Sequence, residues 1–96
     1  MSAARVAVGT VEIHLPDVAS LKGKRRVLKG LKEKLRHRFA ISVAEVDDHD
    51  SWQRATLALA CVSGDSRHAN EVISKAMDFL EDNVEGYVTD VEVEVF

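Results

Sequence analysis

The most chemically distinctive stretch of this sequence is a run of basic side chains between Ser20 and Phe39. It holds nine of the thirteen lysines and arginines of the chain and one acid, Glu33. Lysine and arginine bind the phosphates of nucleic acids, largely by releasing the counterions condensed on them. From this stretch we predict a nucleic-acid contact made by Lys22, Arg25, Arg26, Lys29, Lys32 and Arg36.

The same stretch has the apolar spacing of an amphipathic helix, which Ser20 would cap. At 100° per residue, one side carries Leu21, Leu28, Leu31, Leu35 and Phe39. The opposite side carries Lys22, Arg26, Lys29, Glu33, Arg36 and His37, and like charges four residues apart repel one another. We therefore expect them to meet either acids of this chain or an outside partner, or else to remain simply solvated.

Two glycines, Gly23 and Gly30, interrupt this helix on its exposed side. Each lowers helix stability by roughly 0.5–1 kcal/mol relative to alanine. They are either neutral surface variation or positions where bare backbone lets a partner approach.

The other reactive residue types form no pattern typical of an enzyme. The four histidines are scattered over different elements, and Cys61 lies in an apolar run without an evident activating base. The acidic segment 47–50 is expected to be a turn rather than a metal site, because it has no calcium-loop pattern. We therefore predict a non-enzymatic protein without a cofactor or metal.

Trp52 is expected to cover the end of the core, with base stacking as the weaker alternative.

The elements that position these residues follow from hydrophobic periodicity. Alternation predicts strands over residues 5–15, 41–47, 54–63 and 87–96, with Val91, Val93 and Val95 facing the core. A helical repeat beginning at Ala69, with Asp65 or Ser66 as its cap, predicts a second helix that ends near Asn83. The order predicts an α+β fold, a ferredoxin-like βαββαβ sandwich with a four-stranded antiparallel sheet and two helices on one face.

The sheet face away from the helices is predicted to lack the aromatic residues on which RNA-recognition sheets stack bases. Its middle is apolar, and Val6, Val8, Ala58 and Val62 form a patch suited to a homodimer contact. The alternative is that this face is merely the less buried side of the sheet.

Several motifs resemble the YlxP-like family of small bacterial proteins. They are S-L-K-x-K-R-R-V-L-K at 20–29, F-x-I-S-V-A-E-V at 39–46, D-x-W-Q-R-A at 50–55 and A-C-V-S-G-D at 60–65. The resemblance implies a ferredoxin-like fold and a function that is not established. It also implies encoding beside genes for translation initiation and ribosome maturation. The family usually has an acid where Gly23 stands, so the basic surface here is slightly more positive.

Composition is that of one soluble domain spanning residues 1–96, with a net charge of −3. Residues 65–96 carry nine acids and two bases, so positive and negative surfaces are expected on different sides. No signal or membrane-spanning pattern is visible, which favours a cytoplasmic location.

We predict association with ribosomal RNA or a ribonucleoprotein through the first helix. The alternative is a homodimeric module that docks an acidic protein.

Overall fold

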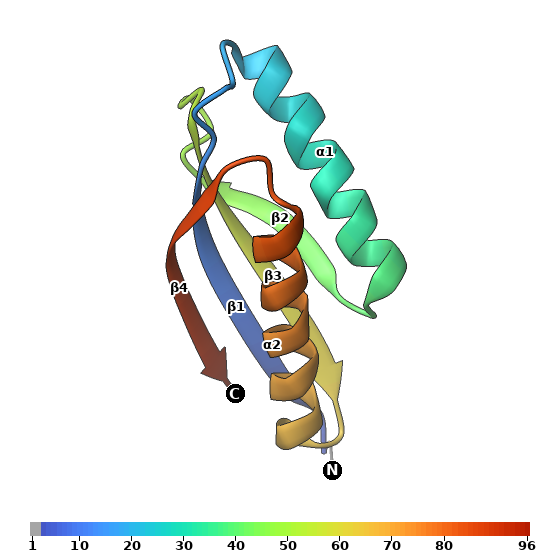
Figure 1. Ribbon diagram of the computed structural model, residues 1–96. Helices are drawn as coiled ribbons and strands as arrows, with labels where there is room; N and C mark the ends of the chain where they lie inside the picture. The colour runs from blue at the N-terminus through green and yellow to red at the C-terminus, as the bar shows by residue number, and fades with distance from the viewer. Residues whose placement is uncertain (1–2) are drawn as a thin grey trace.

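The computed structural model describes residues 3–96 and has the predicted order of elements (Figure 1). Its strands are β1 (Arg5–His14), β2 (Ser42–Asp47), β3 (Arg54–Ser63) and β4 (Tyr87–Val95). Its helices are α1 (Leu21–Arg38) and α2 (Ser66–Asn83). The predicted strand boundaries agree with these to within one residue, and neither described helix is long and apolar enough to cross a membrane.

The four strands form one antiparallel sheet in the order β2-β3-β1-β4. Both helices lie on the same face of this sheet, α2 against its centre and α1 diagonally over β2 (Figure 1). The ferredoxin-like prediction is therefore confirmed. The two central strands come from opposite halves of the chain, and β2 and β4 are the edges.

The core lies between the sheet and the helices and is built mainly from aliphatic side chains. Alternate residues of β1 and β3 are buried there, as their period-two pattern predicts. Gly9 is needed in β1 because a Cβ at this position would collide with the Met77 side chain and lie 2.8 Å from Ile73 Cγ2. A residue without a side chain thus lets α2 approach the sheet closely.

Both helices begin at the predicted caps. The Ser20 hydroxyl accepts a hydrogen bond from Gly23 N at 3.0 Å, and the Asp65 carboxylate accepts one from Arg67 N at 3.0 Å. The helices meet where the Phe39 and Phe79 rings pack edge to face, with centroids 5.7 Å apart. Away from this contact they diverge, which leaves much of α1 open to solvent (Figure 1).

Strand β4 is less covered than its pattern predicts. Val91, Val93 and Val95 pair with helix-side residues of β1, as predicted, but they remain 45 %, 40 % and 44 % exposed. The physical reason is that α2 packs mainly on β1 and β3 and covers the edge strand β4 only in part. These valines face the helical layer without being buried in the core.

Candidate nucleic-acid interface

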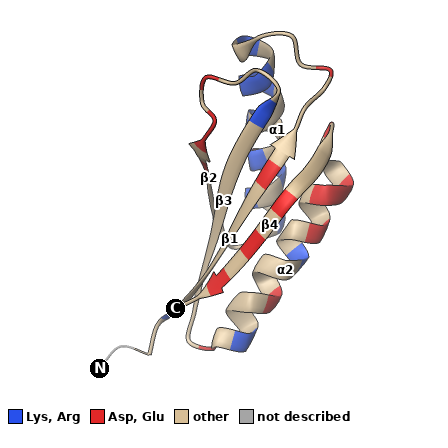
Figure 2. Ribbon diagram, turned by 90° about the vertical axis from the view of Figure 1, so that its left-hand side faces the viewer, with Lys and Arg blue, Asp and Glu red and all other residues tan. Residues whose placement is uncertain are grey.

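Of the predicted contact residues, Lys22, Arg26 and Lys29 lie on the outer side of α1, whereas Lys32 lies beside the buried stripe and Arg36 reaches β2, where its guanidinium donates a hydrogen bond to the Val43 carbonyl oxygen at 2.6 Å. Lys22, Arg25, Arg26, Lys29 and Arg36 are exposed, and Lys32 is half-buried. None of the six forms an ion pair with another residue in the range 3–96. Figure 2 shows α1 as the main basic element, while acids line β4 and α2 and also occur on β1 and on the loops near the start of α1. The separation of charge predicted from the sequence is therefore present, while the role of these residues stays a prediction.

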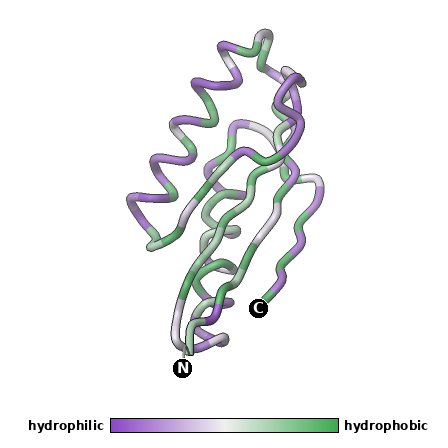
Figure 3. Tube along the Cα trace, turned by 180° about the vertical axis from the view of Figure 1, so that it is seen from behind, coloured by the Kyte–Doolittle hydropathy of each residue, from purple (hydrophilic) through white to green (hydrophobic). Residues whose placement is uncertain are grey.

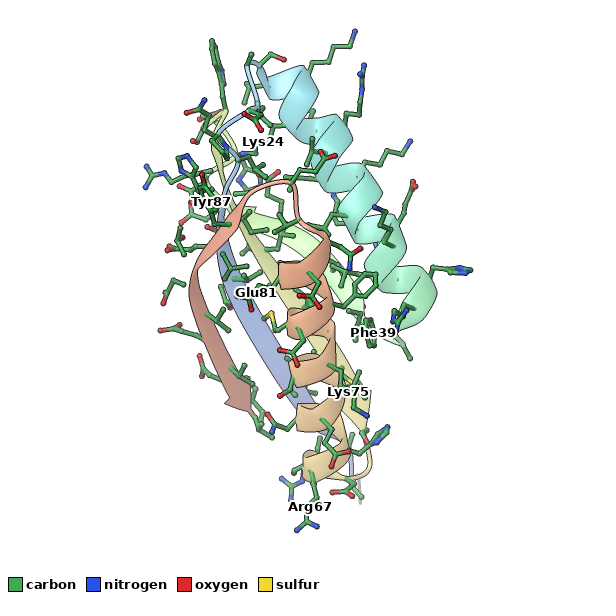
Figure 4. All side chains as sticks on the ribbon, viewed as in Figure 1. Lys24, Phe39, Arg67, Lys75, Glu81 and Tyr87 are labelled. Carbon is green, nitrogen blue, oxygen red and sulfur yellow. The ribbon has the colours of Figure 1, made fainter. Side chains whose placement is uncertain are left out.

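Lys24 does not belong to this basic surface, although it lies in the same run. It is 1 % exposed and projects from α1 toward the sheet (Figure 4). Its Nζ donates hydrogen bonds to the carbonyl oxygens of Asp48 at 2.6 Å and Ser51 at 2.8 Å. It also lies 2.8 Å from Glu45 Oε2, an ion-pair contact without the alignment of a hydrogen bond. One of the nine bases is thus neutralised internally.

The contact between Lys24 and Glu45 could have been predicted from the spacing of these residues, although both are charged and charged residues are usually exposed. Lys24 lies three residues after Leu21 and four before Leu28, so helical spacing places it in the apolar stripe. Glu45 alternates with Ile41 and Val43 and therefore points to the core side of its strand. A base and an acid at inward positions of neighbouring elements indicate a buried pair.

Lys24 fixes the loop that joins β2 to β3, residues 48–53, against the N-terminal half of α1. Asp48, at φ 61°, turns the chain, and its carboxylate accepts a hydrogen bond from the Thr56 hydroxyl at 2.7 Å. The predicted polar turn is confirmed, and the carboxylates of Asp47 and Asp48 both accept hydrogen bonds from within the hairpin. No group of three metal-ligating side chains gathers anywhere in residues 3–96.

The interpretation of Trp52 as a cover over the core is wrong. Its side chain is 55 % exposed and does not belong to the core cluster. The reason lies in the loop, because Lys24 holds the preceding residue, Ser51, by its carbonyl oxygen. Trp52 therefore stands out from the end of the molecule where α1 begins.

A groove of about 230 Å³ runs between the middle of α1 and the segment that links α2 to β4. Val27, Leu31 and Val84 give it an apolar lining, Arg26 and Lys34 lie along its α1 side, and Glu85 lies on the side of the α2–β4 link. Gly30 also lines the groove, and a Cβ at this position would have no neighbour within 4 Å. Gly30 thus exposes bare backbone at a concave site, whereas a Cβ at Gly23 would lie 3.3 Å from the capping hydroxyl of Ser20.

The open face of the sheet exposes less apolar area than its sequence suggests. Val62 is 69 % exposed, but Val6, Val8 and Ala58 are half-buried by their neighbours within the sheet. The predicted dimer patch is therefore small.

Comparison with known proteins identifies the family of this chain. A family model described as "Protein of unknown function (DUF503)" matches residues 6–93. The chain belongs to the DUF503 family. It is also 30 % identical over 70 residues to the uncharacterized protein YlxP of Bacillus subtilis strain 168, covering 73 % of this chain and 76 % of that protein. The YlxP-like resemblance is thereby confirmed, and the function of this DUF503 domain has to be argued from its own surface.

Solved structures resemble this DUF503 domain in fold alone. The designed protein Ferredog-Diesel aligns with a TM-score of 0.46 and 12 % identity, over 93 % of this chain and 83 % of its own. SnoaB, a cofactor-independent oxygenase from Streptomyces nogalater, aligns with a TM-score of 0.47 and 10 % identity, over 99 % and 92 %. At these values neither comparison bears on activity.

Proposed function

We propose that this domain binds structured RNA, either free or in a ribonucleoprotein, through the outer side of α1. The observation that carries this proposal is the row of exposed bases on α1 that are not paired with carboxylates of residues 3–96. Such a row is repulsive within the helix and gains most from a polyanion, whose condensed counterions it releases. Contacts of this kind position a protein on RNA and carry little sequence information.

The exposed Trp52 supports the same proposal, because Lys24 holds the loop that carries it against the N-terminal half of α1. An indole of this exposure stacks on an unpaired base, and stacking tolerates any base. In this arrangement α1 would contact the phosphates of the RNA. Trp52 would favour nucleotides that are single-stranded or in loops. The acids of β4 would repel RNA from the far side of the molecule, so binding would be confined to α1.

The test is binding to ribosomal RNA at increasing salt. Six phosphate contacts predict that the logarithm of the binding constant falls with the logarithm of salt concentration with a slope of about −4 to −5. Replacing Lys22, Arg26 and Lys29 by Glu should reduce that slope by about half and weaken binding at every salt concentration. Intact RNA binding by this triple variant would overturn the proposal.

A matched control separates a local contact from the effect of net charge. Arg5, Arg67 and Lys75 are exposed bases outside α1, and replacing them by Glu changes the net charge by the same amount. We expect this control variant to keep most of its RNA affinity, because screened charges act only over about 8–10 Å at physiological salt.

A second candidate is an acidic protein that docks on α1, and the groove favours it. A helix with both apolar and acidic residues would fit the lining of Val27, Leu31 and Val84 between Arg26 and Lys34. In that case the triple variant would lose a protein complex and keep its RNA affinity.

Homodimerisation through the open sheet face belongs to this second candidate. Replacing the exposed Val62 by Lys would abolish a dimer formed through this face, and sedimentation velocity measures the oligomeric state directly.

A further inference from the structure

The two edges of the sheet are protected to different extents. At β2, the Arg36 guanidinium donates a hydrogen bond to the carbonyl oxygen of Val43 at 2.6 Å, and the strand is only six residues long. A β-bulge between Glu45 and Asp47 further distorts this edge. Short, bulged and covered edges resist pairing with another strand. Strand β4, by contrast, has nine residues, and its outer side has no neighbouring strand among residues 3–96.

The outward backbone groups of β4 can be assigned from its pairing with β1. Val6 and Phe96 exchange both backbone hydrogen bonds, at 3.3 and 2.8 Å, so they form a hydrogen-bonded pair. Hydrogen-bonded and non-hydrogen-bonded pairs alternate along an antiparallel ladder. Val91, Val93 and Val95 therefore direct their N–H and C=O groups to the free edge, as a partner strand requires.

The side chains of the same three valines form an exposed apolar ladder on the helical side of β4. They are 40–45 % exposed and end beside Phe96, which is 63 % exposed. The alternation of apolar and polar residues along β4 is visible in Figure 3. An added strand with apolar residues at alternate positions would place them beside these three valines. It would also widen the sheet on which α2 packs.

The opposite face of β4 determines what kind of strand can be added. Asp90, Glu92 and Glu94 alternate with the valines and are exposed (Figure 2). If a second copy paired through β4, these acids would meet the same acids of its β4, and like charges opposite one another are destabilising. A strand with Lys or Arg at these positions would instead form three favourable cross-strand pairs.

We propose that β4 binds an extended segment of a basic protein in which cationic and apolar residues alternate, adding it as a fifth strand. Backbone hydrogen bonds to the three valines supply affinity, and the three acids select the cationic partner. This site lies on the acidic side of the domain and does not depend on RNA binding by α1. The acidic edge strand, which would repel RNA, would thus bind an extended basic segment of a protein.

The first experiment measures binding of a synthetic seven-residue peptide of alternating Lys and Val. The expected result is slower amide hydrogen exchange at Val91, Val93 and Val95, with no change at Val43 on the other edge. A peptide of the same composition with its lysines and valines in two blocks should bind roughly tenfold more weakly, because it cannot place charge and apolar residues on opposite faces. Equal binding of the two peptides would overturn the proposal.

Substitutions in β4 separate strand addition from simple charge attraction. Val93→Pro removes one N–H that points to the free edge and leaves the hydrogen bonds to β1 intact, so the strand tolerates it. We expect Val93→Pro to lose peptide binding by roughly tenfold or more, while Val93→Ala, which keeps the N–H, loses less. Similar losses in both variants would contradict a backbone contact.

A charge exchange makes the test independent of folding defects. With Glu92→Lys and Glu94→Lys, the preference should invert toward an alternating Glu and Val peptide, a gain that a damaged fold would not produce. Protection of the three valine amides without any peptide, increasing with protein concentration, would identify a second copy as the occupant and overturn the proposal.

Discussion

The Lys24 ammonium lies 2.8 Å from the Glu45 carboxylate, in the layer where α1 packs on β2. This pair connects the most basic element of the chain to an edge strand, and the same ammonium holds two carbonyl oxygens of the loop after that strand. The buried leucines of α1 hold it on the sheet, and its two ends are fixed by the Lys24 contacts and by the Phe39–Phe79 contact. Between these two contacts the helix presents its bases to solvent.

We predict that Lys24→Met destabilises the domain by about 3 kcal/mol, because it leaves Glu45 and two carbonyl oxygens without their cation. The free energy of unfolding from urea titration measures this loss. In the double variant Lys24→Met, Glu45→Leu, the carboxylate is removed as well, so part of the stability should return. The part that does not return measures the contribution of the loop carbonyls. The single variant Glu45→Leu completes the comparison. If the loss in the double variant equals the sum of the losses in the two single variants, Lys24 and Glu45 are not coupled.

Periodicity predicted the layers of the fold because each element buries one face. The spacing of Ile73, Ala76 and Leu80 defined α2, and the alternation of Ala7, Val11 and Ile13 defined the core side of β1. The boundaries follow from local chemistry, such as the Ser20 and Asp65 caps. Information of this kind is contained within a few neighbouring residues.

The features that were missed depend on how far one element covers another. The exposure of Val93 depends on the distance of α2 from the sheet edge, and that of Trp52 depends on a contact between residues 24 and 51. Neither exposure can be predicted from the few residues that surround Val93 or Trp52 in the sequence. The candidate site was predictable as a set of residues on one helix, whereas the groove at Gly30 appears only when α1 lies beside the α2–β4 link.

Gly9 and Gly30 are predicted to respond in opposite directions to alanine. Gly9→Ala should destabilise by about 1–3 kcal/mol, because its methyl group would be forced against Met77 and Ile73 in a packed core. Thermal unfolding of the two variants side by side measures the difference. A Gly9→Ala protein as stable as the parent would mean that α2 can shift away from β1 without cost.

Gly30→Ala should stabilise the domain by about 0.5–1 kcal/mol, since the new methyl group meets no atom within 4 Å and alanine favours the helix. If the groove receives a partner, Gly30→Leu should then weaken binding of that partner while the domain remains folded. Gly64, which also has open space around it and lies outside the helices, provides a matched control for the added side chain. Unchanged binding in Gly30→Leu would leave Gly30 as neutral surface variation.

Trp52→Ala is predicted to change stability little, within about 0.5 kcal/mol, because the indole is more than half exposed and outside the core. The same change should weaken binding of single-stranded RNA by about 1–3 kcal/mol, the contribution of one stacked base. Trp52→Phe, which keeps an aromatic face, should retain most of that affinity. The salt dependence should stay the same in all three proteins, because stacking releases no counterions. A loss of affinity accompanied by a smaller salt slope would instead show that Trp52 positions α1, and tryptophan fluorescence quenching on RNA addition to the parent protein separates the two roles.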